Sequence, residues 1–123
     1  MPEPLDAVLD RLLAFALEFP HAWEDHPWGD TVVKVGKKIF AFIGTSEHPG
    51  CSVKLPESVE QALLLDCCSP TGYGLGKAGW VTIGLSRPDC PPAEVIEDWI
   101  EESYRTVATK KLVAELEART HTR

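Results

Sequence analysis

Four side chains of the types that bind metals or transfer protons crowd one short segment of the sequence. They are His21, Glu24, Asp25 and His26. The HxxxxH spacing of the two histidines lies outside any helical pattern, so it lacks the one-face geometry that zinc ligands on a helix share. We therefore expect solvated polar groups here and no metal ion. A general base at Glu24 or His26 is the enzymatic alternative.

A glycine-rich segment, GLGKAG at residues 74–79, matches the GxGxxG spacing of dinucleotide-binding loops. That fingerprint requires a helix after the glycines, whereas the strand-like residues 80–83 follow here. A phosphate-binding loop is also excluded, because the spacing before Lys77 is one residue short and Ala78 replaces the Ser or Thr that would bind Mg²⁺. We expect no nucleotide cofactor and interpret the glycines as a sharp bend that presents Lys77.

The sequence offers no recognisable catalytic nucleophile. No serine lies in a GxSxG motif, and no histidine partner can be assigned to a cysteine from the sequence. The cysteines lack CxxC spacing, so we expect reduced, small side chains without metal ligation. These four residues are Cys51, Cys67, Cys68 and Cys90. We therefore predict a protein that is not an enzyme and that has no catalytic residues and no cofactor.

Helical periodicity is clear in two segments that would position the remaining residues. Apolar residues recur every three or four positions over residues 5–17, and again over residues 92–108, where Trp99 is predicted to dock the helix on a sheet. Pro56 is predicted to open a second helix, and Thr109 to cap a short last one. Acidic residues 94–102 are interpreted as the solvated face of their helix.

Strand-like residues surround a two-residue turn in the middle of the sequence. β-branched residues 31–35 and aromatic and aliphatic residues 39–43 flank Gly36 and Lys37, which predicts a β-hairpin. Residues 51–55 and 80–85 are predicted strands. Residues 21–30 are predicted to be an ordered loop in which Trp23 and Trp28 act as packing anchors, with a stacking platform as the alternative. The whole chain, residues 1–123, is predicted to be one α+β domain, an antiparallel sheet with helices on one face.

Two packing predictions follow from the alternation of side chains along strands. Phe40 and Phe42 are expected on one face of the sheet, because residues two apart point the same way. Trp28 and Trp80 are expected to be mostly buried as anchors of the sheet.

The charge distribution limits the classes of partner. The net charge is −7, yet residues 31–54 contain four lysines against one glutamate and form a basic island with a balance of +3. An acidic body repels phosphates at long range, so no general affinity for nucleic acid is expected. The N-terminal segment places acids before its apolar residues, and no apolar run reaches membrane-spanning length. We expect a cytoplasmic protein with no membrane partner.

Three motifs in order resemble the MmcQ/YjbR family of small bacterial proteins. They are EDHPWGDTVVKVGKKIFAFIG at residues 24–44, GLGKAGWVTIGL at 74–85 and IEESYRTV at 100–107. The resemblance covers nearly the whole chain and implies a CyaY-like fold with two projecting β-hairpin wings. Family members are commonly proposed to bind DNA. The resemblance places Glu24, Trp28 and Trp80 at positions that would support the bases of the wings.

The resemblance also implies which residues would contact DNA. The first wing would comprise Val35, Gly36, Lys37 and Lys38, and the second would centre on Lys77 within residues 74–79. The leading hypothesis is a non-enzymatic DNA-binding module in which lysines contact phosphates; the proposed set is Lys34, Lys37, Lys38 and Lys77. The alternative is a domain that binds a small ligand or a protein in a cleft between the wings; its lining would be Trp28, Tyr73 and Trp80.

Overall fold

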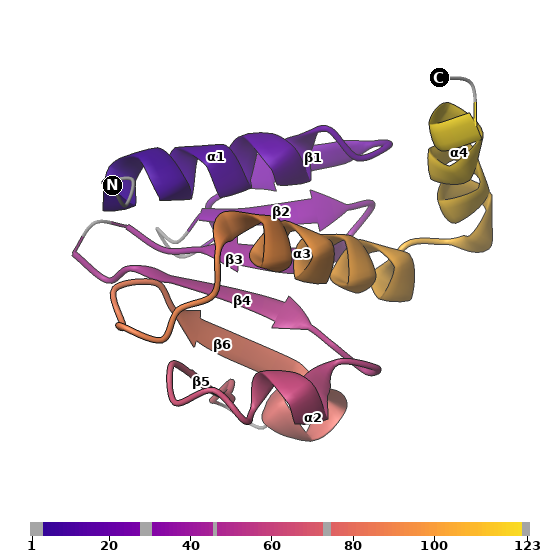
Figure 1. Cartoon of the computed structure of the whole chain (residues 1–123). Coiled ribbons are helices and arrows are strands. Elements are labelled where there is room, and N and C mark those ends of the chain that lie inside the picture. The colour runs from indigo at the N-terminus through magenta and orange to yellow at the C-terminus, as the bar shows by residue number, and fades with distance from the viewer. Residues whose placement is uncertain (1–3, 28–30, 46, 73–74, 122–123) are drawn as a thin grey trace.

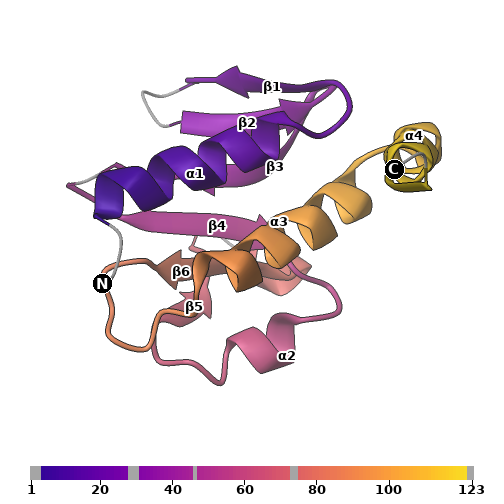
Figure 2. The same cartoon turned by 45° about the horizontal axis from the view of Figure 1, so that its top comes forward.

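The structure, a computed structural model, describes residues 4–27, 31–45, 47–72 and 75–121. An antiparallel sheet forms one layer, and α1 and α3 cross one of its faces (Figure 1). Turning the molecule shows the two layers, with the helices in front of the strands (Figure 2). The strand order is β1-β2-β3-β4-β6-β5. The predicted α+β fold class is confirmed, whereas the CyaY-like likeness stays a prediction.

The elements follow one another with short connections. The helical elements are α1 Leu5–Leu17, α2 Val59–Ala62, the 3₁₀ helix η1 Leu75–Ala78, α3 Ala93–Val107 and α4 Lys110–His121. The strands are β1 Ala22–Asp25, β2 Thr31–Val35, β3 Lys38–Ile43, β4 Gly50–Lys54, β5 Cys68–Pro70 and β6 Trp80–Gly84. The two long predicted helices and the central hairpin are therefore confirmed within a residue or two.

The core lies between the sheet and the two long helices. Leu12 of α1 and Ile96 and Ile100 of α3 are fully or almost fully buried, as expected for the apolar stripe of an amphipathic helix. Arg11 of α1 adds a polar contact between the helices, because its guanidinium donates hydrogen bonds to the carboxylates of Glu97 and Glu94. Trp99 lies at the margin of the core and is only partly buried.

Phe40 and Phe42 lie on opposite faces of the sheet, so the prediction of a shared face was wrong. Phe40 contacts Tyr104 of α3 at a ring-centroid distance of 5.2 Å, whereas Phe42 contacts Trp80 at 5.5 Å, away from the core. The cause is a β-bulge: Ala41 pairs with Val33 but Ile39 pairs with Lys34, which leaves Phe40 as an extra residue. A bulge interrupts the alternation on which the prediction relied.

Three weaker elements differ from their predictions. The segment expected to be a loop at residues 21–30 contains the edge strand β1, whose half-exposed residues have no apolar alternation. The helix expected from Pro56 is only the four-residue α2. The glycine-rich segment, expected to be a sharp bend, contains the single turn η1, and the short strand β5 precedes it; the glycines disfavour longer elements.

The last helix, α4, packs Leu112 and Leu116 against the margin of the core and also makes polar contacts. Arg105 of α3 donates a hydrogen bond of 3.0 Å to Glu117, and His21 lies 3.6 Å from Glu115. The backbone N–H of Leu112 donates to the Thr109 hydroxyl, which confirms the predicted cap. In the part of the chain that the structure describes, no helix has the length and apolar character needed to cross a membrane.

Candidate functional site

The lysine hairpin, residues 31–43 of β2, its turn and β3, is the centre of the candidate site. Gly36 and Lys37 form the two-residue turn, and Gly36 has a φ of 62° while Lys37 is not among the positive-φ residues. This sign pattern belongs to a type II′ turn, which matches the twist of the flanking strands and favours glycine first. Lys37 and Lys38 are both exposed, so the turn presents two cationic side chains to solvent.

Trp23 of the edge strand lies beside this turn. Its indole N–H donates a hydrogen bond of 3.0 Å to the Gly36 carbonyl, which couples β1 to the turn. Lys34, its partner in the β1–β2 ladder, places its ammonium 5.2 Å from the ring centroid, within the range of a cation–π contact. The residue as a whole is still 44% exposed. The lysine hairpin therefore carries a fixed, solvent-facing aromatic surface.

Lys34 is not a free cation like the two lysines of the turn. Its ammonium lies 2.7 Å from the Asp25 carboxylate, and its side chain is only 18% exposed. The hydrogen bond from Lys34 lowers the pKa of Asp25, and the backbone N–H of His26 adds to this effect. Lys34 thus bridges Asp25 and Trp23. Its predicted contact with phosphate stays a prediction.

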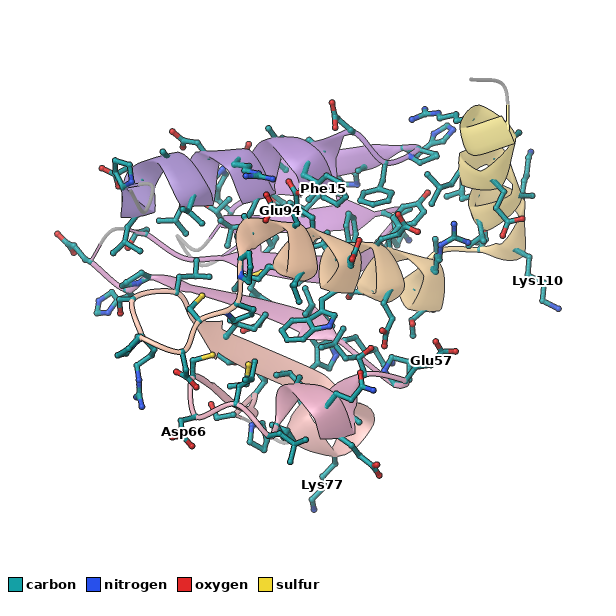
Figure 3. The ribbon with its side chains drawn as sticks, viewed as in Figure 1. Phe15, Glu57, Asp66, Lys77, Glu94 and Lys110 are labelled. Carbon is teal, nitrogen blue, oxygen red and sulfur yellow. The ribbon has the colours of Figure 1, made fainter. Side chains whose placement is uncertain are left out.

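Lys77, the lysine of the second predicted wing, lies on η1 immediately before β6. The antiparallel register places the start of β3, the end of β4 and the start of β6 at the same end of the sheet, because Lys54 pairs with Trp80. Lys77 and the turn of the lysine hairpin therefore share that end. β4 separates β3 from β6, so these strands are about 10 Å apart. Lys77 is exposed and points away from the body of the molecule (Figure 3).

Of the predicted ligand cleft, the structure describes one residue of three. Trp80 is buried, with 8% of its surface exposed, and contacts Phe42 edge to face. This confirms its packing role. Trp28 and Tyr73 lie outside the described residues. A cavity of about 660 Å³ lies elsewhere, between α1 and the segment before α3. Its lining includes Val8, Leu85, Arg87, Cys90 and Ile96.

Helix α3 fixes the base of the lysine hairpin. The buried Ser103 hydroxyl donates a hydrogen bond of 2.6 Å to the Phe40 carbonyl and accepts one of 2.9 Å from the Lys54 N–H. It thereby joins β3 and β4 beside the bulge. The Tyr104 hydroxyl donates to the Pro20 carbonyl ahead of β1. The Ser-Tyr pair thus supports β3, β4 and the start of β1 at this end of the sheet.

Ion pairs and burial, and not a shared site, account for the residues that were considered as metal ligands or nucleophiles. His26 lies 2.8 Å from Glu24, while Asp25 pairs with Lys34. Within the described ranges, no three His, Cys, Asp or Glu side chains gather closely enough to hold a metal ion. The cysteines are free thiols. Burial raises the pKa of Cys51 and Cys68 to about 12, which leaves little of the nucleophilic thiolate at neutral pH.

The arrangement of lysine hairpin, η1 and Ser-Tyr helix can be compared with known families. A YjbR family model matches residues 17–106, more than half of the chain. The chain belongs to the YjbR family. The matched range includes the whole lysine hairpin, η1 and the Ser103-Tyr104 pair, and it ends before α4. A search of curated proteins found no match.

Sequence reasoning missed Trp23 as a residue of the site of this YjbR family member. It grouped Trp23 with Trp28 as a packing anchor, because it assigned no strand to residues 22–25. The available signal was the spacing of Trp23 and Asp25, because residues two apart on a strand lie on the same face. Pairing of β1 with β2 then places both side chains beside Lys34. Lys54 was also left out, although it ends β4 at the same end of the sheet.

Proposed function

We propose that this protein is a non-enzymatic nucleic-acid-binding protein that contacts phosphates through the lysine hairpin. The observation that carries the proposal is the turn itself, where Lys37 in the two-residue connection and Lys38 at the start of β3 are both exposed. The backbone of a short turn loses less freedom on binding than that of a long loop, and phosphate contacts supply most of the sequence-independent affinity. Lys77, at the same end of the sheet, is the third contact.

Lys34 has a different role in this proposal. Its pairing with Asp25 at 2.7 Å and its position over Trp23 make it a support for the hairpin surface. Three phosphate contacts correspond to a slope of log K against log salt of about −2.7 for duplex DNA. With a net charge of −7 on the whole protein, the expected affinity is modest and depends strongly on salt.

The test replaces Lys37 and Lys38 with glutamine in the full chain. Fluorescence anisotropy with labelled duplex and single-stranded DNA, titrated over salt, should show weaker binding and a slope shallower by about 1.8 on the duplex. Thermal stability should hardly change, because both side chains are exposed.

The matched control replaces Lys110 and Lys111, which open α4; Lys110 points away from the sheet (Figure 3). This variant removes the same charge and should leave binding nearly intact. Equal weakening by both double variants would mean that the attraction is diffuse. If the folded wild type binds neither probe at low salt, the proposal fails. The small-ligand alternative would then be favoured, with the 660 Å³ cavity beside α1 as its first candidate.

A further inference from the structure

Trp23 is unusual among the apolar side chains of this protein. In the described part of the chain, the large apolar side chains that are exposed are Trp23, Leu63 and Leu64. Leu63 and Leu64 follow the short helix α2, whereas Trp23 sits on the sheet beside the lysine turn. Exposing an indole forfeits the free energy of its burial, and Trp is the side chain that stacks best on flat ring systems.

We propose that Trp23 is a stacking site for an unpaired base, so that the lysine hairpin binds single-stranded nucleic acid in preference to duplex. This inference rests on the proposed function and names its substrate class. The ring is held in place by its hydrogen bond to Gly36 and by the Lys34 ammonium. A base covers the 44% of the residue that remains exposed, while Lys37 and Lys38 contact the phosphates on either side.

The geometry favours a single strand for two reasons. Bases in a duplex are already stacked and paired, and the proteins that reach between them insert a projecting apolar side chain. Trp23 does not project from a turn, since its indole N–H is bound back to the Gly36 carbonyl at 3.0 Å on an edge strand. A ring held against the sheet suits the stacking surfaces on which single strands bind.

The charge distribution also favours a single strand over a duplex. Glu24 follows Trp23 directly and the protein as a whole carries −7, whereas the charge of Asp25 is paired with Lys34. A duplex has a higher charge density than a single strand, as the steeper salt dependence per contact shows. Acidic neighbours therefore penalise a duplex more than a short single strand, which can keep its phosphates on the lysine side of the ring.

The experiment compares a labelled oligodeoxythymidine with a duplex of equal length at low salt. Trp23→Ala should weaken single-strand binding about 5- to 160-fold, the range that one stacked base supports, and should weaken duplex binding far less, by no more than the loss of the indole contact to the turn causes. Trp23→Phe should retain most of the single-strand affinity. Trp23→Leu keeps an apolar contact for β1 without the aromatic face and should behave like the alanine variant. Leu64→Ala removes another exposed apolar residue and should change nothing.

The outcomes separate the two proposals. Wild type that binds neither probe overturns the proposed function. Wild type that prefers duplex, or a leucine variant that is folded by circular dichroism and binds the single strand as tightly as wild type, overturns the stacking site alone. Equal loss on both probes for a folded Trp23→Leu variant also overturns it, because the ring would then support the hairpin without reading an unpaired base.

Discussion

Replacing Ser103 with alanine tests whether α3 fixes the base of the lysine hairpin. The hydroxyl is fully buried and makes two hydrogen bonds, one to the Phe40 carbonyl and one from the Lys54 N–H. Alanine leaves both backbone groups without this partner. Each unsatisfied buried group costs about 1–3 kcal/mol, and alanine regains a few tenths of a kcal/mol in helix propensity. We expect a net loss of about 2–5 kcal/mol in the free energy of unfolding.

Urea unfolding followed by circular dichroism measures this loss through the transition midpoint, provided that the m-value is unchanged. Native-state hydrogen exchange should also show faster exchange of the Lys54 amide, because its acceptor is gone. Thr106→Ala is the matched control, since that hydroxyl lies on the same helix and donates to the Glu102 carbonyl from an exposed position. It should change stability by less than about 0.5 kcal/mol. A loss below about 1 kcal/mol for Ser103→Ala, with unchanged Lys54 exchange, would refute the reasoning.

Two further predictions concern the turn and its support. Gly36→Ala should destabilise the protein by about 1–2 kcal/mol in urea unfolding, because φ is 62° although nothing crowds the added Cβ; an unchanged midpoint would contradict the assigned turn. The lowered pKa of Asp25 means that its pairing with Lys34 stabilises the fold above the ordinary aspartate pKa of about 4, and that this contribution disappears as the pH falls through the lowered value. Asp25→Asn should therefore be less stable than wild type at neutral pH and equally stable in acid, and a pH-independent difference would rule out the ion pair as the cause.

The sequence predicted those parts of the fold that local patterns determine. The 3.6-residue period of α1 and α3, the β-branched run of β2 and the glycine of the turn each follow from neighbouring residues. β1 was missed because its residues Ala22–Asp25 show no apolar alternation; pairing with β2 alone makes it a strand. The bulge at Phe40 was missed for the same reason, since the extra residue exists only relative to the register of β2.

The sequence allowed us to predict which lysines lie in the candidate site, but not the contacts between side chains there. Lys37 was placed correctly on the turn, because Gly36 is a strong local signal, and Lys38 begins the strand that follows. The pairing of Lys34 with Asp25 joins two strands across an intervening segment, and no local rule connects those positions. The same holds for the indole of Trp23, whose partner carbonyl is thirteen residues away.

The two hydrogen bonds that the Ser103 and Tyr104 hydroxyls donate also bear on the order in which parts of the protein fold. Their acceptors, Phe40 and Pro20, lie 63 and 84 residues earlier in the chain. Closing such long loops costs entropy before any contact compensates, so these bonds form late in folding. During synthesis the lysine hairpin leaves the ribosome well before α3 does. Its lysine and indole surface therefore acquires its final geometry only after α3 has emerged.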